Sequence, residues 1–545
     1  MKNNKKRGLL ASAGALVTAV ALALGGAATA QAAPPNMPAK SGLVITKLEQ
    51  PTTAGAAATG ESIDVSSYTA IQGVDFAAYP VTVSGTPGTD AWLANMAAVT
   101  LAQAQTEVDG PPAVTAVRTG TTDANGVISW TGASTTDGDL DRGLYLIRET
   151  STPTGVIGSG DFLVALPMTN PTALNDWLPT VYVYPKNARV GNPVKTVSNA
   201  ADLKVGDTVT WTISADLPRK RAADNSVVPT DYFEVSDALT DAQLVLNETS
   251  PATGITASAP GVTLTKGTET PVTGDYYIKS TTVAGVTTHQ VIFTPDGLAK
   301  LATSAGANLT NKLTVTLDTT VKQTAVIGNQ AKVFPNQLSK TEDKPLTSNN
   351  AEVKYGTYGL NKVSSAATQP ASLAGAQFKV YASEAAALAG GNDNLKPDVT
   401  GTGYDPVTGV WTTATDGQVN VAGLRYSNFA DNAVQAKFID DGGTCANYNA
   451  GGANCQPNTK FQTYWLVEVK ALSGHQLLAA PVSFEVNENS ATQAYEIVNQ
   501  ENKNGFVLPL TGGMGTAILT VGGIAILAIV LIVARRRRDT EANAE

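Results

Sequence analysis

The chain has 545 residues, and charged residues make up only 15% of it, against about 25% in a typical soluble domain. It contains two histidines, His289 and His475, and two cysteines, Cys445 and Cys455, so it holds almost no material for serine–histidine–aspartate triads or clustered metal ligands. The formal net charge of −9 argues against nucleic-acid binding, while a hydrophobic content of 43% can form folded cores. We therefore expect no metal, no cofactor and no nucleic-acid partner.

The N-terminus has the pattern of a secretory signal peptide. Lys2, Lys5, Lys6 and Arg7 precede a nearly uncharged run over residues 8–28, which ends in the small-residue sites Ala-Thr-Ala and Ala-Gln-Ala. We expect cleavage after Ala32, with Ala30 as the other candidate. A retained membrane helix that anchors the start of the chain is the alternative.

The middle of the chain predicts an all-β protein. Residues 208–213, 312–317 and 377–381 alternate polar with apolar or β-branched residues at a period of two, and turn clusters occur at 123–126, 295–297 and 415–417. Helical patterns are limited to 90–105, 295–304 and 383–389. At about 150 residues per domain, the chain divides into three β-sandwich modules, 33–188, 189–355 and 356–507, which would form an elongated rod.

The first module carries two recognisable sequence motifs. The segment 143–155 reads GLYLIRETSTPTG and resembles the pilin E-box, in which a glutamate, here Glu149, follows an aromatic residue by four positions on a buried strand. The segment 177–186 reads WLPTVYVYPK and resembles the pilin motif at every fixed position. The strand alternation places Val181 and Val183 on one face, and Pro185 removes a ladder donor, which leaves Lys186 at the end of the module. The resemblance implies that the Lys186 amine is joined to the next subunit.

The later modules resemble those of collagen adhesins, which are immunoglobulin-like. In the middle module, Asp237 in the run FEVSDAL is similar to the aspartate of A-type modules. In the third module, residues 415–424 (TDGQVNVAGL) resemble the turn and strand of B-type modules, and 463–471 (TYWLVEVKA) is a second E-box that contains Glu468 but lacks the later proline.

Such modules form an intramolecular isopeptide bond from three residues. A lysine buried among apolar side chains loses its charge and becomes nucleophilic, and a buried carboxylic acid stays protonated, so it can hydrogen-bond an asparagine carbonyl and shuttle protons as ammonia leaves. Position in each module implies three sets of lysine, acid and asparagine: Lys362, Glu468 and Asn499; Lys195, Asp237 and Asn329; Lys47, Glu149 and Asn187. For each lysine the alternative is an ordinary snorkelling surface charge.

Cys445 and Cys455 lie in an insertion between Leu424 and Tyr464. Outside the cell this spacing favours a disulfide that staples a long loop. The loop could be a binding surface, or the staple could simply protect it from proteolysis.

The C-terminus combines three features in register: Leu508-Pro509-Leu510-Thr511-Gly512, an apolar run over 513–534 long enough to span a bilayer, and four consecutive arginines from Arg535. This order resembles the sorting signal of Gram-positive surface proteins, which implies that a sortase cuts between Thr511 and Gly512 and that residues 513–545 are removed. An ordinary single-pass membrane protein is the alternative.

Together these resemblances identify a major shaft subunit of a Gram-positive fimbria that supports adhesion and biofilm formation, attached covalently to the cell wall after a transient membrane-anchored stage. Its expected partners are a pilin-specific sortase, other copies of itself head to tail, a tip adhesin, and peptidoglycan through a housekeeping sortase. A monomeric wall-anchored adhesin for a host protein or glycan is the alternative. For a secreted enzyme the sequence offers no site; its only chemistry would be the single-turnover isopeptide bonds.

Overall fold

The computed structural model describes residues 37–51, 58–134, 136–222, 226–248, 254–365, 372–440 and 455–502. The expected signal peptide, the LPLTG motif and the apolar C-terminal run lie outside these ranges. Within them strands predominate, which confirms the all-β prediction, and no helix is long and apolar enough to cross a membrane.

Residues 40–189 form three sheets, with strand orders β10-β1-β5, to which β6 is added, β2-β11-β8 and β4-β3-β7-β9. The strand β10 pairs in parallel with β1, and β11 pairs in parallel with β2, so the end of this region lies beside its beginning. The bounds are β1 (Lys40–Thr46), β2 (Leu48–Glu49), β3 (Asp75–Val81), β4 (Arg118–Thr121), β5 (Val127–Trp130), β6 (Leu140–Asp141), β7 (Gly143–Ser151), β8 (Val156–Ile157), β9 (Phe162–Leu166), β10 (Thr180–Val183) and β11 (Lys186–Arg189).

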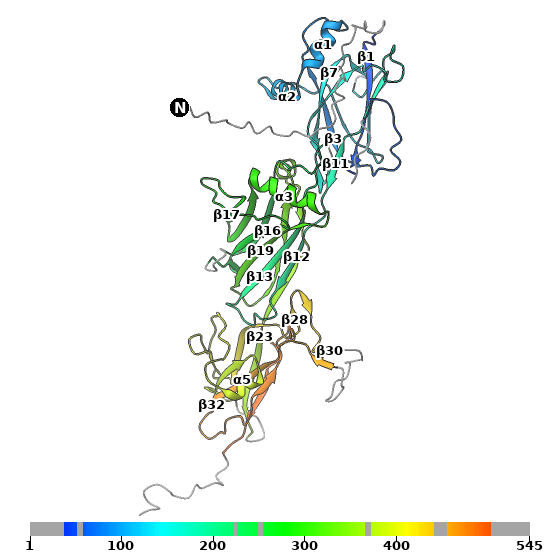
Figure 1. The fold of residues 1–545 in the computed structure, drawn as a ribbon. Helices are drawn as coiled ribbons and strands as arrows, with labels where there is room; N and C mark the ends of the chain where they lie inside the picture. Colours follow the sequence, from blue (N-terminus) through cyan, green and yellow to red (C-terminus); the bar gives the residue numbers. More distant parts are fainter. Residues whose placement is uncertain are drawn as a thin grey trace, which may run out of the picture. The chain divides into compact units, whose positions relative to one another are not determined.

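Two helices, α1 (Asp90–Ala98) and α2 (Leu101–Asp109), cover one face of the β4-β3-β7-β9 sheet (Figure 1). Trp92, Met96 and Val108 pack there against Leu144 and Leu146 of β7. The single helix predicted over 90–105 is two helices, because the Thr100 side chain accepts a hydrogen bond from the Gln103 backbone N–H and starts a new helix with a capping box.

Residues 194–347 form two sheets, ordered β12-β13-β19-β15, with β16 also paired to β19, and β17-β18-β14-β21-β22. The burial of β13 alternates residue by residue, so its inward side chains form a core with β19, as the period of two predicted. The helix predicted over residues 295–304 is confirmed and is capped by Thr294; Pro295–Gly297, which was also expected as a turn, is its first turn. The bounds are β12 (Val194–Ser198), β13 (Thr208–Asp216), β14 (Glu234–Thr240), β15 (Leu244–Leu246), β16 (Ile255–Ser258), β17 (Tyr276–Val283), β18 (Val286–Phe293), α3 (Pro295–Ala307), β19 (Lys312–Val321), β21 (Ala331–Phe334), α4 (Gln337–Thr341) and β22 (Leu346–Thr347).

The last region is organised around the long strand β23. Its first residues pair antiparallel with β20, and its last residues pair in parallel with β34. A second sheet has the order β25-β26-β24-β32-β33. The bounds are β20 (Val326–Asn329), β23 (Ala351–Ser364), β24 (Gln377–Tyr381), α5 (Glu384–Ala389), β25 (Tyr404–Asp405), β26 (Val410–Thr412), β27 (Gln418–Arg425), β28 (Phe429–Ala430), β29 (Ala433–Val434), β30 (Phe438–Asp440), β31 (Cys455–Pro457), β32 (Tyr464–Lys470), β33 (Val482–Phe484) and β34 (Tyr495–Asn499).

The chain groups into two compact units, one of residues up to 356 together with 423–461, the other of 357–422 and the residues from 462 onward. The insertion expected inside the third module therefore groups with the earlier unit. Arg425 is fully buried there; its backbone N–H donates to the Leu203 carbonyl and its guanidinium to the Phe429 carbonyl, at 2.8 and 2.7 Å. The division into three modules stays a prediction.

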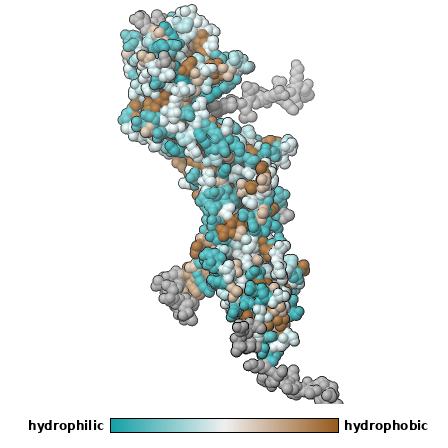
Figure 2. Space-filling view, turned by 180° about the vertical axis from the view of Figure 1, so that it is seen from behind, coloured by the Kyte–Doolittle hydropathy of each residue, from teal (hydrophilic) through white to brown (hydrophobic). Residues whose placement is uncertain are grey.

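The visible surface is mainly hydrophilic. On the face shown in Figure 2, hydrophilic residues predominate and apolar side chains lie in small groups. Isolated exposed apolar residues are normal on folded proteins and identify no binding surface by themselves.

Candidate functional site

The structure brings together the three residues predicted as a cross-linking site in the last region. Lys362 on β23, Glu468 on β32 and Asn499 on β34 are at most 5% exposed. Parallel pairing of β23 with β34 places Ser364 opposite Asn499, so lysine and asparagine come from neighbouring strands. The Lys362 amine donates to Asn499 Oδ1, Asn499 Nδ2 donates to Glu468 Oε1 at 2.7 Å, and the lysine nitrogen lies 3.7 Å from that carboxyl oxygen.

The surroundings of Lys362 favour its neutral amine. Burial lowers its pKa to about 8, against the opposing effect of Glu468, and the Phe378 ring centre lies 5.7 Å from its nitrogen. A neutral lysine amine carries the lone pair that attacks a carbonyl carbon. The site therefore combines a nucleophile, an amide and an acid in contact with one another.

The first region contains a second such group. Lys47, Glu149 and Asn187 are 0%, 8% and 1% exposed. The Lys47 amine donates to Glu149 Oε1, and Asn187 Nδ2 donates to Glu149 Oε2 at 2.9 Å. Burial lowers the pKa of Lys47 to about 8, while the charge of Glu149 acts in the opposite direction. The side-chain oxygen of Asn187 has no hydrogen-bond partner among the described residues.

The two E-box glutamates share a backbone arrangement that the sequence motif did not reveal. Phe76 lies directly opposite Glu149 and Phe378 directly opposite Glu468, and in both pairs of strands a β-bulge follows the glutamate. Bulges turn a side chain toward a site. In both, the backbone N–H ten residues later, of Ser159 or Leu478, donates to the glutamate Oε2 at 3.0 Å.

A glycine six residues after each glutamate allows the chain to turn back, so that the later backbone N–H reaches the glutamate. Gly155 and Gly474 have φ angles of 79° and 81°, a left-handed conformation that glycine adopts without strain. The spacing from glutamate to glycine and from glutamate to donor could have been found by aligning the two segments. The bulge could not, because it depends on the partner strand.

The middle group is built differently. Lys195 on β12 and Asp237 on β14 are at most 2% exposed, and the Lys195 amine donates to Asp237 Oδ2. Burial lowers the pKa of Lys195, and the Trp211 ring centre lies 5.3 Å from its nitrogen. Asn329 ends β20 and Ala331, two residues later, lies directly opposite Asp237. Both polar atoms of the buried Asn329 side chain lack a hydrogen-bond partner among the described residues.

Lys186 is less exposed than the sequence suggested. The strand β10 ends at Val183, but strand pairing resumes at Lys186, which starts β11 and lies opposite Leu48. Lys186 is therefore part of a paired strand and not an unpaired chain end. The amine lies 3.3 Å from the Tyr184 carbonyl oxygen, to which it donates, and burial lowers its pKa. Within the motif, Val181 is fully buried and Val183 packs against the same core.

The remaining predicted residues lie partly outside the described ranges. Cys455 is on β31, whereas Cys445 and the LPLTG residues Leu508 to Gly512 are not described, so the disulfide stays a prediction. His289 and His475 both have hydrogen-bonded rings, to Ser280 and Ser364. Within the described ranges no group of His, Cys, Asp and Glu could hold a metal ion.

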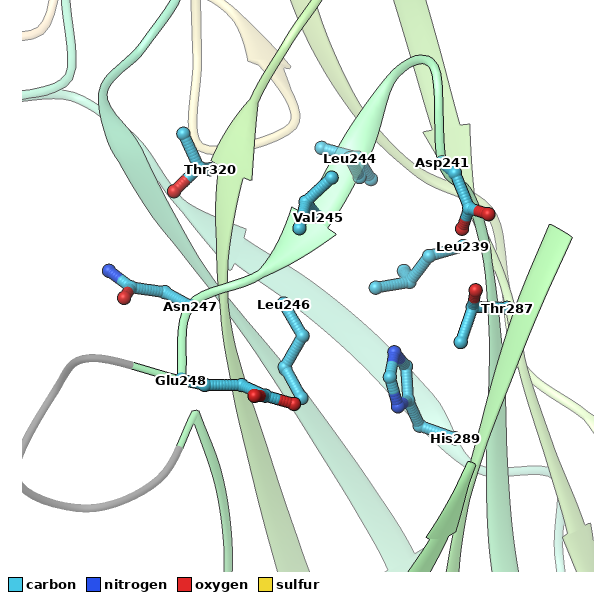
Figure 3. Close-up of a pocket in the computed structure, with 10 residues that line it drawn as sticks. All are labelled: Leu239, Asp241, Leu244, Val245, Leu246, Asn247, Glu248, Thr287, His289 and Thr320. Carbon is cyan, nitrogen blue, oxygen red and sulfur yellow. The ribbon is translucent and has the colours of Figure 1, made fainter. Parts of the chain in front are cut away.

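A pocket of about 540 Å³ lies in the middle region of the chain (Figure 3). Leu239, Leu244 and Leu246 line it together with His289, whose strand position is directly opposite Asp237. Lys195, Asp237 and Asn329 are not among its lining residues. The pocket is therefore separate from the cross-linking group.

Two family profiles match the chain. The profile described as "Gram-positive pilin subunit D1, N-terminal domain" matches residues 39–188, and the "LPXTG cell wall anchor motif" matches residues 500–541. The first match includes Lys47, Glu149, Lys186 and Asn187.

Curated relatives and solved structures agree with these matches. The chain is 29% identical over 451 residues to "Fimbrial subunit type 1" of Actinomyces viscosus, covering 78% of each chain, and 26% identical over 426 residues to "Fimbrial subunit type 2" of Actinomyces naeslundii, covering 73% of this chain and 70% of that one. The Corynebacterium diphtheriae major pilins SpaD and SpaA superpose with TM-scores of 0.53 and 0.54 at 24% and 21% identity. These matches cover 86% and 85% of this chain and 99% and 100% of those chains, and at such identities they show a shared fold.

Proposed function

We propose that this chain, which is a Gram-positive, sortase-assembled pilin subunit of a cell-wall-attached fimbria, polymerises through a covalent bond between Lys186 of one copy and Thr511 of the next. The observation that carries this proposal is the state of Lys186: an amine at the end of the pilin motif, half-buried, with a pKa lowered by burial. A lowered pKa increases the fraction of neutral amine, which is the nucleophilic form of lysine.

The joining reaction uses the sortase as the catalyst and this chain as both substrates. The Thr511–Gly512 peptide bond breaks as the sortase cysteine takes the Thr511 acyl group, and Lys186 Nζ then displaces the cysteine and forms an amide with the Thr511 carbonyl carbon. One lysine and one threonine at different places on the chain make a head-to-tail contact that does not close on itself. Repetition of that contact builds a filament.

Inside each subunit, the three buried groups support isopeptide formation between lysine and asparagine. The lysine nitrogen bonds to the asparagine Cγ, the Cγ–Nδ2 bond breaks, and ammonia leaves with a proton that the acid has carried from the amine. The contacts among Lys362, Glu468 and Asn499 support this most directly, because amine, amide and acid already touch. Glu149 and Asp237 are the corresponding acids of the other two groups.

The completed filament would support adhesion and biofilm formation from the cell wall. A pilin-specific sortase would join the subunits, a housekeeping sortase would transfer the last Thr511 to peptidoglycan, and a separate adhesin would occupy the tip. The anchor motif and the fimbrial relatives support the proposed polymerisation and wall attachment.

Substitution of Lys186 tests the polymerisation. In cells that express Lys186→Arg, which keeps the charge but removes the primary amine, we expect the high-mass ladder of wall extracts to collapse to wall-attached monomer. Lys40→Arg is the matched control, because Lys40 is an exposed lysine of the same region that forms a surface ion pair with Asp141. A ladder that persists in Lys186→Arg would exclude this linkage, and a wild-type protein that gives only monomer would favour a monomeric adhesin.

A further inference from the structure

The two E-box glutamates differ in how many hydrogen-bond donors reach them. Glu468 accepts hydrogen bonds from the backbone N–H of Leu478 and the amide of Asn499, while the Lys362 nitrogen stays 3.7 Å away. Glu149 accepts from the corresponding backbone N–H and amide, directly from the Lys47 amine, and also from a hydroxyl.

That hydroxyl belongs to Ser159, which stands where the last region has Leu478. Ser159 Oγ lies 2.6 Å from Glu149 Oε1, to which it donates, and accepts from the Lys47 amine at 3.3 Å. It therefore bridges the acid and the nucleophile. The neighbouring Gly158 allows this close approach, because a Cβ at that position would lie 3.3 Å from Glu149 Oε2.

Cross-linking requires the lysine to be neutral and the acid to be protonated. A donor to the carboxylate and an acceptor for the ammonium both stabilise the opposite, ion-paired form. The Ser159 hydroxyl does both at once, and the leucine side chain at position 478 does neither. The neutral, reactive form of Lys47 and Glu149 is therefore less favourable relative to the ion pair than the neutral form of Lys362 and Glu468.

We propose that Ser159 is a positioning residue that slows the Lys47–Asn187 cross-link by stabilising the ion pair of Lys47 and Glu149, so that the first region closes later than the last. This rests on the isopeptide chemistry proposed above. In the delayed step, Lys47 Nζ bonds to Asn187 Cγ, the Cγ–Nδ2 bond breaks, and Nδ2 leaves as ammonia with the amine proton carried by Glu149. Ser159 is neither consumed nor changed.

The test measures the two cross-links separately in one protein. The mature ectodomain is made by cell-free synthesis, samples are quenched in acid over time, and the cross-linked and free peptides around Asn187 and Asn499 are quantified by mass. We expect Ser159→Ala to speed the Lys47–Asn187 cross-link by about tenfold to a hundredfold, from the usual strength of a hydrogen bond to a charged group. Ser159→Thr, which keeps the hydroxyl, should retain the wild-type rate.

A pH profile distinguishes this role from a merely structural one. The charged groups that act on Lys47 are Glu149, Lys186 and Lys220, and the substitution leaves all three in place. Loss of the hydroxyl should move the acid limb of the rate profile to higher pH and the alkaline limb to lower pH. Leu478→Ser is the reciprocal variant and should slow the Lys362–Asn499 cross-link.

The outcomes separate this inference from the chemistry on which it rests. If Glu149→Ala and Glu468→Ala lose no cross-link, the isopeptide assignment itself is wrong. If those variants lose their cross-links but Ser159→Ala keeps the wild-type rate and pH profile, the chemistry stands and the role of Ser159 is refuted.

Discussion

Tension in a shaft of this kind would enter each subunit at Lys186 and leave at Thr511. A bond between Lys362 and Asn499 would offer that tension a path that skips the intervening chain, because the two residues lie on adjacent parallel strands. Glu468→Gln keeps the size of the side chain but removes the acid, so the bond should not form. The last region should then unfold and lengthen under force.

The size of the effect follows from the chain length that the bond encloses. The two residues are 137 positions apart. At 3.3–3.6 Å per extended residue, unfolding of this segment releases roughly 450–490 Å of contour length, and the small separation of the paired strands changes this little. The wild-type protein should release none of it.

The assay is single-molecule force spectroscopy on the mature ectodomain, pulled between position 186 and the C-terminal end. Glu149→Gln is the matched control. It removes the acid of the group that contains Lys47. Residues 47–185 precede the point at which force is applied, so the force should not unfold them. We expect the control to match the wild-type trace.

Two results would refute this reasoning. A wild-type trace that already contains the roughly 450–490 Å step, by the same count per residue, would show that no bond joins Lys362 and Asn499. A Glu468→Gln trace without that step, in protein whose mass shows one ammonia more than wild type, would show that the load does not pass through these strands.

Two further predictions concern pH and the insertion. Asn187→Ala prevents the cross-link and leaves Lys47 as a buried amine, whose pKa in the folded state is about 8, below its ordinary 10.5. Between those two values the unfolded state binds more protons than the folded state, so the free energy of unfolding, measured by chemical denaturation, should rise with pH by about 3 kcal/mol at most. A free energy that does not change with pH would contradict the burial argument. For the insertion, a thiol-reactive label should not modify the unreduced wild-type ectodomain, because both cysteines are expected to be in the disulfide. The same label should react with Cys455 in the Cys445→Ser variant. Labelling of the unreduced wild type would exclude the predicted disulfide.

Local patterns were sufficient to predict the fold class and most candidate residues. Alternation at a period of two predicted the strands around Thr208 and Lys312, because a half-buried strand needs an apolar residue at every second position. The E-box and the pilin motif singled out Glu149, Glu468 and Lys186, because those motifs are contiguous in the chain.

The asparagines required more than local pattern. They were selected by their position in each module, and the structure places β11 beside β2 and β34 beside β23. For the middle group the structure shows contact between Lys195 and Asp237, while the Asn329 amide has no partner among the described residues.

By itself, the sequence predicted an all-β fold and revealed the sorting and pilin motifs, because periodicity and contiguous motifs are properties of neighbouring residues. Only the tertiary structure decided that Lys186 is half-buried at the start of β11, that a bulge follows each E-box glutamate, and that Ser159 bridges Lys47 and Glu149. Those features depend on which strands pair, in what register, and on which loop returns to the site. Residues far apart in the chain set all three, so no local pattern records them.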